Sequence, residues 1–200
     1  AKVLDLACGK GRHSMTLSSF GLDVLGVDLS PNSIQFAKEN AHGKVQFQVH
    51  DMRDAIPNQQ FDAIFNLFTS FGYFDDLNDN NKVMSSIYSM LRPNGLLIID
   101  FMNSQKVENE LVASETKNVE SIAFKIKRKY TGTHFLKSIS FSDVNKQFAF
   151  EEKVQALKLA DFSRLLEANN FKLIRTFGNF NLSTFDENES DRLILIAQKI

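Results

Sequence analysis

Short apolar runs alternate with amphipathic segments along the first half of the chain. Strands apolar on both faces that alternate with helices are typical of a parallel sheet covered by helices on both sides. Ser30 followed by Pro31 is a strong helix start, because serine caps free amides and proline has none. The predicted strands are 2–7, 23–28, 45–49, 61–67 and 96–102, and the predicted helices are 12–20, 31–42 and 79–91.

From about residue 118 to 157 the apolar positions recur with a period of two, as at Ile122, Phe124 and Ile126. With turns near Gly132 and Asp143–Lys146, this predicts a three-stranded antiparallel meander. A helix at 160–169 and strands at 171–177 and 193–197 complete the pattern. We therefore expect one α/β domain over residues 1–200, with a β flap inserted at about 104–158.

Composition removes several classes of function. The 200 residues carry 23 basic and 24 acidic side chains, so no net charge draws the chain to nucleic acid or to an anionic membrane. The single cysteine, Cys8, forms no internal disulfide, and no cluster suggests a metal. No apolar run is long enough to span a membrane, and the chain does not open with a signal peptide. Both observations favour a cytoplasmic location. Nineteen phenylalanines and no tryptophan predict a phenylalanine-packed core and pocket.

Two features predict a site for a nucleoside-containing cofactor. Asp5-Leu6-Ala7-Cys8-Gly9-Lys10-Gly11 joins the first strand to a helix, and its glycines let a ligand approach bare backbone. Asp28 ends the second strand, where a carboxylate can accept both hydroxyls of a ribose. After the third strand comes His50-Asp51-Met52-Arg53-Asp54, where an acid can bind the adenine amine.

Two side chains distinguish between the possible nucleoside cofactors. A dinucleotide fingerprint has Gly or Ala where this chain has Ser14. An acid at Asp5 would repel a pyrophosphate, whereas it could bind a cationic group directly or through water. S-adenosylmethionine (SAM) is cationic and carries no phosphate, so it is favoured. A nicotinamide-dependent oxidoreductase remains the alternative.

These motifs, together with Phe61–Tyr73 and Leu91–Asp100, resemble in order and spacing those of class I SAM-dependent methyltransferases. The segment Phe68–Tyr73 and the β insertion look most like the small-molecule branch, which includes amino-sugar N-methyltransferases. The resemblance implies a Rossmann-like, doubly wound sheet of seven strands with the last antiparallel. It also implies a further helix before residue 1, so we expect part of the active site to lie upstream.

The resemblance also assigns roles to residues. Gly9 and Gly11 would line the methionine end, Asp28 would hold ribose, and Asp51 and Met52 would hold adenine. The residues that we expect at the cofactor are Asp5, Ala7, Gly9, Gly11, Asp28, Leu29, Asp51, Met52, Asn66 and Leu67, with the last pair beside the sulfonium. Nucleic-acid amine methylases carry an (Asp/Asn)-Pro-Pro-(Tyr/Phe) box after the fourth strand, and Asn66-Leu67-Phe68-Thr69 has no proline, which argues against a nucleic-acid substrate.

The expected reaction is methyl transfer from SAM to a nitrogen or oxygen atom of a small molecule. Tyr73 and His13 are the candidate bases, with His134 in the flap as a third. A basic cluster at Lys125, Lys127, Arg128 and Lys129 could attract an anionic or nucleotide-linked acceptor, and a phenylalanine-rich flap face could form a homodimer. A SAM-binding protein without catalysis is the other alternative.

Overall fold

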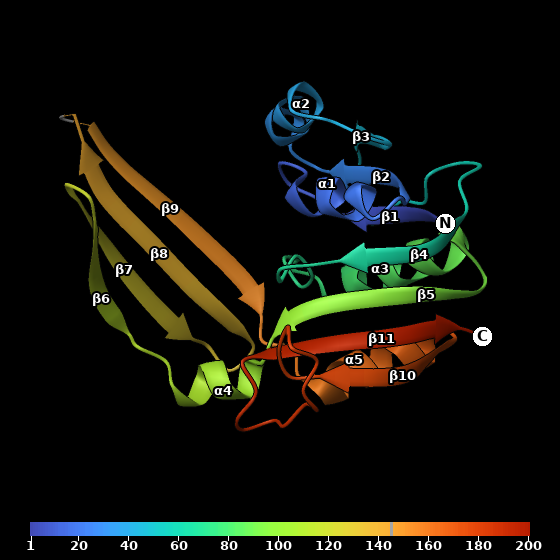
Figure 1. Ribbon diagram of the computed structural model, residues 1–200. Coiled ribbons are helices and arrows are strands. Elements are labelled where there is room, and N and C mark those ends of the chain that lie inside the picture. The colour runs from blue at the N-terminus through green and yellow to red at the C-terminus, as the bar shows by residue number, and fades with distance from the viewer. Residues whose placement is uncertain (145) are drawn as a thin grey trace.

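The protein is built around a seven-stranded sheet of mixed direction (Figure 1). A computed structural model describes residues 1–144 and 146–200, with the exception of the Leu77 side chain. The strand order is β10-β11-β5-β4-β1-β2-β3. These strands are β1 Lys2–Leu6, β2 Asp23–Asp28, β3 Val45–Val49, β4 Phe61–Asn66, β5 Leu91–Met102, β10 Phe171–Phe177 and β11 Arg192–Lys199.

Strand directions agree with the predicted fold class. The pairs β1–β2, β1–β4, β2–β3 and β4–β5 are parallel, whereas β11 runs antiparallel to both β5 and β10. The strand order reverses between β1 and β4, where the chain leaves one half of the sheet for the other. In open α/β sheets, ligands bind beyond the carboxyl ends of the strands at such a reversal.

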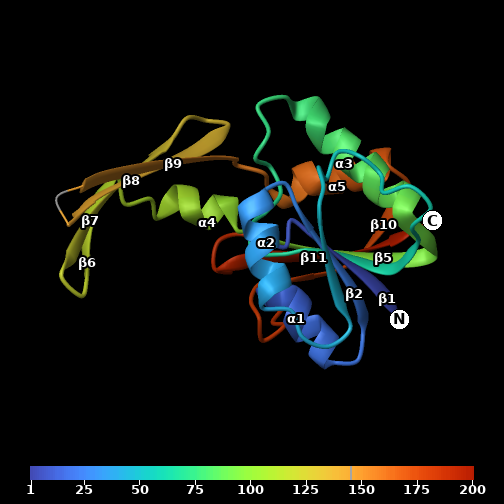
Figure 2. The same cartoon turned by 90° about the horizontal axis from the view of Figure 1, so that it is seen from above.

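Helices cover both faces of this sheet (Figure 2). On one face lie α1 Arg12–Ser19 and α2 Pro31–Glu39, and on the other lie α3 Leu77–Met90 and α5 Leu159–Ala168. Ser30 caps α2 by accepting the Ser33 amide, as the Ser-Pro pair predicts. Helix α3 begins two residues before its predicted start, because Asp76 supplies the cap.

Phenylalanine rings fill the core, as the composition predicts. Phe162 on α5 is fully buried and lies between two other rings, with centroids 5.6 Å from Phe71 and 5.2 Å from Phe101. Truncation of such a side chain to alanine typically costs about 3–5 kcal/mol. Phe71 belongs to the loop after β4, so packing of the core also anchors the loop that approaches the strand ends.

The flap is a separate antiparallel sheet of four strands, one more than predicted. It contains β6 Ser114–Val119, β7 Ile122–Tyr130, β8 His134–Asp143 and β9 Lys146–Gln155, and it follows the short helix α4 Ser104–Asn109. The additional strand β6 is a polar edge strand without apolar alternation, so the periodicity could not reveal it. Gly132 with φ 89° occupies the predicted β7–β8 turn. The other predicted turn, Asp143–Lys146, includes residue 145, which lies outside the described residues.

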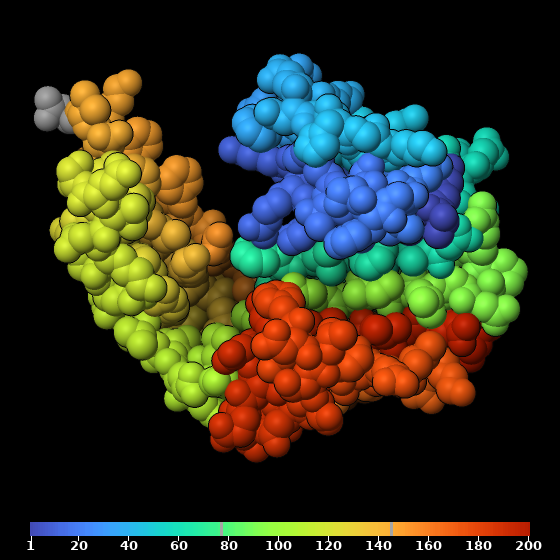
Figure 3. Space-filling view, in the orientation of Figure 1, coloured from blue at the N-terminus to red at the C-terminus, as the bar shows by residue number. Residues whose placement is uncertain are grey.

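The base of the flap is joined to the core. Phe135 and Val154 are buried in the main hydrophobic cluster. The Gln155 amide donates to the Gly72 carbonyl at 2.8 Å, which ties the end of β9 to the loop after β4. From this base the flap extends outward, and the space-filling view shows an open groove between it and the N-terminal half (Figure 3).

Candidate active site

The turn after β1 is built from residues in the left-handed backbone region. Ala7 has φ 64°, Gly9 φ 56° and Gly11 φ 81°. Glycine adopts these angles without the steric cost that a side chain adds. The turn is fixed to the neighbouring strand because the Cys8 amide donates to the Val27 carbonyl at 2.8 Å. The backbone thus turns sharply beyond β1, and α1 begins at Arg12.

The two glycines of the turn have different surroundings. A Cβ atom built on Gly9 would meet no heavy atom of the described residues within 4 Å, so this glycine borders open space. A Cβ atom on Gly11 would lie 2.5 Å from the Phe47 ring. Gly11 is therefore needed for packing between the turn and β3, whereas Gly9 leaves room for a ligand.

Asp28 connects the end of β2 to this turn. Its Oδ2 accepts the Gly9 amide at 2.9 Å, and its Oδ1 accepts the Ser30 amide at 2.8 Å. Each carboxylate oxygen has two lone pairs and so keeps one acceptor position after these bonds. Asp28 is half-buried, and no ion pair to it is found among the described residues.

Asp51, after β3, is paired with Arg53. The Arg53 Nη2 atom lies 2.6 Å from Asp51 Oδ2, and Nε lies 3.1 Å from Oδ1. These hydrogen bonds lower the pKa of the Asp51 carboxyl, so it is ionised at neutral pH. Arg53 also pairs with Asp79 at 2.9 Å and lies over the Phe74 ring. Arg53 thereby links the end of β3 to the loop after β4.

A cavity of about 460 Å³ lies where these strands end. It is reached from the carboxyl ends of β1, β2, β3 and β4, which is the place that the switch in strand order predicts. Its wall is formed by Ala7, Gly9, Asp28, Leu29, His50, Asp51, Met52, Arg53, Phe68, Thr69, Ser70, Tyr73 and Phe74. The structure therefore brings together the glycine turn, Asp28 and Asp51, as the sequence predicted.

Four residues that we expected at the cofactor are not on this wall: Asp5, Gly11, Asn66 and Leu67. Asp5 is 1% exposed and accepts a 2.5 Å hydrogen bond from the Ser14 hydroxyl, and burial raises its pKa to about 6. Asn66 is buried beneath the wall, where its Nδ2 donates to the Leu6 carbonyl at 2.9 Å. Its Oδ1 is buried and has no hydrogen-bond partner among the described residues. The Leu67 carbonyl accepts the Ser70 hydroxyl, which stabilises the loop.

Of the candidate bases, Tyr73 alone lines the cavity. Burial and the nearby Glu152 raise the pKa of its phenol, so Tyr73 is protonated at neutral pH and can donate a hydrogen bond. His13 is outside the wall, and its ring centroid lies 6.3 Å from that of Phe68. Burial and Arg12 lower the pKa of His13. His134 lies at the base of the flap, bonded to the Thr133 hydroxyl.

Six residues of the wall were not predicted from the sequence: His50, Arg53, Phe68, Thr69, Ser70 and Phe74. Four belong to the loop after β4, which has no periodicity. Phe68-Thr69-Ser70-Phe71-Gly72-Tyr73 was the available signal, because an aromatic and small-residue run that follows a strand at a topological reversal belongs to a binding loop.

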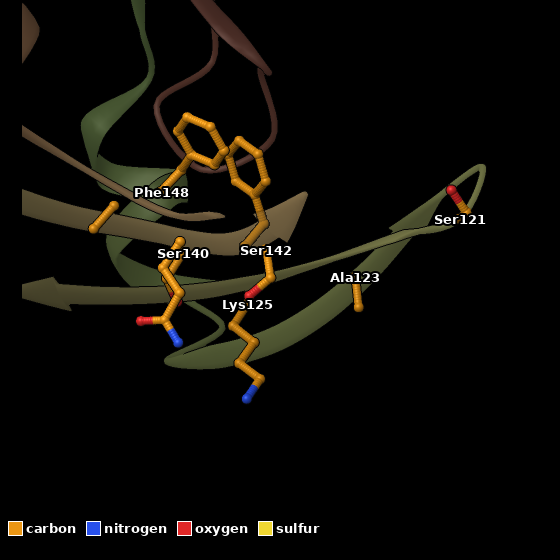
Figure 4. A pocket seen from close by; sticks show the side chains of 9 residues that line it. Ser121, Ala123, Lys125, Ser140, Ser142 and Phe148 are labelled. Atoms are coloured by element: carbon orange, nitrogen blue, oxygen red, sulfur yellow. The ribbon is translucent and has the colours of Figure 1, made fainter. Parts of the chain in front are cut away.

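Two larger hollows lie on the flap, away from the strand ends. One of about 600 Å³ is lined by Ser121, Ala123, Lys125, Ser140, Phe141, Ser142, Gln147, Phe148 and Ala149 (Figure 4). Figure 4 shows Lys125 and Phe148 on opposite sides of the sheet. On the phenylalanine side, Phe141 lies 4.6 Å from Phe124 and 5.0 Å from Phe148, measured between ring centroids. The homodimer through this face stays a prediction.

The lysines of the basic cluster do not share the face that packs on the core. Lys129 is opposite Leu136, whereas Tyr130 is opposite the buried Phe135. Side chains alternate between faces along a strand, so Lys125, Lys127 and Lys129 project away from the side that carries Phe135. Arg128 is on the Phe135 side and pairs with Glu115 at 2.7 Å.

The described part of the chain contains no grouping of three or more acidic, histidine or cysteine side chains able to hold a metal ion. Among its helices, none has both the length and the apolar character that a bilayer crossing requires.

Known proteins resemble this chain over most of its length. A family model described as "Methyltransferase domain" matches residues 1–140. The glycine/sarcosine N-methyltransferase of Aphanothece halophytica is 31% identical over 205 residues, which covers 99% of this chain and 76% of that protein.

Solved structures share the fold at lower identity. A SAM-dependent methyltransferase from Clostridium acetobutylicum superposes with a TM-score of 0.86 at 20% identity, covering 99% of this chain and 83% of that one. The SAM-bound CalS10, an amino pentose methyltransferase from Micromonospora echinaspora, superposes with a TM-score of 0.77 at 18% identity, covering 100% and 84%.

Proposed function

The chain belongs to the methyltransferase domain family, and we propose that it transfers the methyl group of SAM to a nitrogen atom of a small-molecule acceptor. The relative from Aphanothece halophytica is named for methylation of glycine and sarcosine, and CalS10 for an amino pentose. Both names concern small molecules that carry an amine. These names support a small amine as the acceptor class.

The convergence of three strand ends on one cavity supports the cofactor assignment most directly. Asp28 lines this cavity and keeps free acceptor positions for the ribose hydroxyls. Gly9 leaves the space beside it free of side-chain atoms. Met52 provides an apolar surface for adenine, and the ionised Asp51 beside it provides an acceptor for the adenine amine. The residues present therefore fit SAM.

When bound, SAM supplies an electrophilic methyl carbon attached to a sulfonium. The chain's own contribution is then to exclude water and to orient the acceptor, since well-oriented reactions gain about 7–11 kcal/mol from proximity alone. Tyr73 can orient an acceptor by donating its phenolic proton. Asp51 is a weak base because Arg53 lowers its pKa. An unprotonated amine needs no strong base, which favours nitrogen over an unactivated hydroxyl.

The charge of the acceptor is a separate part of the proposal. Because Lys125, Lys127 and Lys129 project away from the Phe135 side of the flap, we assign them no contact with the acceptor. Arg128 and Lys137 are neighbours on the other face and are paired with Glu115 and Glu152. We propose that this row of mixed charge faces the acceptor, which favours a zwitterionic or polar acceptor over a strongly anionic one.

Isothermal titration and mass spectrometry test the proposal together. We expect SAM to bind the purified protein and NADH not to bind. With SAM carrying a deuterated methyl group, we expect the label on the nitrogen of an amine from a panel of amino acids, amino sugars and matched hydroxy analogues. NADH binding without SAM binding would favour an oxidoreductase. Label only on hydroxyl acceptors would refute the choice of nitrogen, and SAM binding without any product would favour the non-catalytic alternative.

A further inference from the structure

Two consecutive residues after β4 adopt a backbone conformation that side chains disfavour. Phe68 has φ 61° and Thr69 has φ 60°. A β-branched residue such as Thr69 is an outlier in the left-handed region. Such conformations persist where the surrounding structure holds them, and they are concentrated at functional sites. Both residues line the cavity, so the contacts that hold them also set the shape of its wall.

Asp100, on the neighbouring strand β5, holds the backbone of both residues. Its Oδ2 accepts the Phe68 amide at 2.9 Å, and its carbonyl oxygen accepts the Thr69 amide at 2.9 Å. Asp100 is 4% exposed. A carboxylate removed from water in this way is stable only when it is paired and fully hydrogen-bonded.

Arg192, at the start of β11, supplies the partner. Its Nε donates to Asp100 Oδ1 at 2.8 Å, and its Nη2 donates to the Thr69 hydroxyl at 2.9 Å. One guanidinium therefore joins the buried acid to the residue with the unfavourable φ. The planar, forked guanidinium can make both bonds at once, whereas a lysine ammonium at the end of a flexible chain lacks this fixed geometry.

The conformation of this loop determines where the Phe68 ring lies. Phe68 is 63% exposed and lines the cavity. The Arg12 guanidinium lies 5.3 Å from its centroid, and the His13 ring lies 6.3 Å from it. The loop thus carries an aromatic ring from β4 to the start of α1.

We propose that Asp100 and Arg192 are positioning residues, which hold Phe68 and Thr69 in the left-handed conformation and so keep the Phe68 ring on the wall of the cofactor cavity. This proposal takes from the proposed function only that the molecule bound in the cavity is SAM. Neither residue lines the cavity. They act through the loop, and no step of the reaction passes through them.

Hydrogen exchange of the Phe68 and Thr69 amides in the ligand-free protein is the first test. In Arg192→Lys we expect both amides to exchange at least tenfold faster, while amides in β1 and α3 keep their rates. Arg175→Lys, on the exposed part of β10, is the matched control and should leave all rates unchanged. Equal acceleration throughout the chain, or no acceleration at Phe68 and Thr69, would overturn the proposal.

The second test asks whether backbone strain is what Arg192 controls. Asparagine enters the left-handed region more readily than threonine does. We expect Arg192→Lys to lose SAM affinity by a factor of five or more. Addition of Thr69→Asn to this variant should slow amide exchange at positions 68 and 69 at least threefold and should restore part of the SAM affinity. Failure of this rescue in the exchange data would contradict the proposal. A wild-type protein that binds no SAM would refute the proposed function and leave the exchange test valid.

Discussion

The Asp28 carboxylate accepts the Gly9 amide at 2.9 Å and so joins the end of β2 to the turn after β1. This bond joins two residues that both line the cavity. Asp28 thus lines the cavity and also holds Gly9, which lines the cavity beside it.

Replacement of Asp28 by alanine should weaken SAM binding by at least tenfold. Hydrogen bonds to a charged group contribute about 1.5–3 kcal/mol, and the alanine variant cannot form the hydrogen bonds that the Asp28 carboxylate would make with the ribose hydroxyls. Isothermal titration with SAM measures the effect. Asp23→Ala, at the other end of β2, is the matched control and should bind normally. Unchanged affinity in Asp28→Ala would show that the cofactor lies elsewhere.

Asp5→Asn should stabilise the fold at neutral pH. Burial raises the pKa of folded Asp5 to about 6, above its value near 3.9 in the unfolded chain. The folded state therefore binds more protons between about pH 4 and pH 6, and its stability falls as the pH rises through that window. Above about pH 6 the ionised acid costs up to about 3 kcal/mol, which asparagine avoids while still accepting the Ser14 hydroxyl.

Urea unfolding of wild type and Asp5→Asn at pH 4, 5, 6 and 7.5 measures this difference. The advantage of the variant should be small at pH 4 and should reach its full value above about pH 6. Asp23→Asn serves as the control for the loss of one negative charge. An advantage that is constant across this pH range would contradict the raised pKa of Asp5.

Gln155→Glu should loosen the junction between the flap and the loop that carries Tyr73. Gln155 is 1% exposed, its Nε2 donates to the Phe74 carbonyl at 2.7 Å, and its Oε1 accepts from Asn80 at 2.5 Å. Glutamate would set a buried carboxylate oxygen against the Phe74 carbonyl. We expect a loss of about 1–3 kcal/mol in the free energy of unfolding, because the Phe74 carbonyl loses its donor and the carboxylate oxygen that replaces Nε2 faces another acceptor.

This loss should be larger at pH 8 than at pH 5, where the buried acid can be protonated. Gln147→Glu, near the exposed end of the same strand, should cost less than about 0.5 kcal/mol at either pH. Equal losses in the two variants would mean that the Gln155 amide does not hold the junction.

Local sequence patterns were sufficient for most of the sheet and for half of the site. Asp28 and Gly9 were predictable because each lies at the end of an apolar strand, and parallel strands bring their carboxyl ends to one edge. Gly9 and Gly11 could not be distinguished, since the difference is the Phe47 ring that packs against Gly11 alone.

Long-range contacts explain what the sequence could not predict. Arg192 and Thr69 are 123 positions apart, and no local sequence pattern connects them. Asp5 had the right residue type and spacing for a cofactor contact, yet Ser14 on α1 covers it. Five of the six residues of β6 are polar, so only the pairing of this strand with β7 identifies it.

The attachment of the flap has a consequence for the engineering of new acceptor ranges. Gln155 bonds to the carbonyls of Gly72 and Phe74, the two residues on either side of Tyr73. In a chimaera that exchanges the flap alone, a β9 from another protein would contact the original loop at residues 72–74. We expect this mismatch to displace Tyr73. Grafts between relatives should therefore carry residues 72–74 together with the strands, as one module with two separate segments.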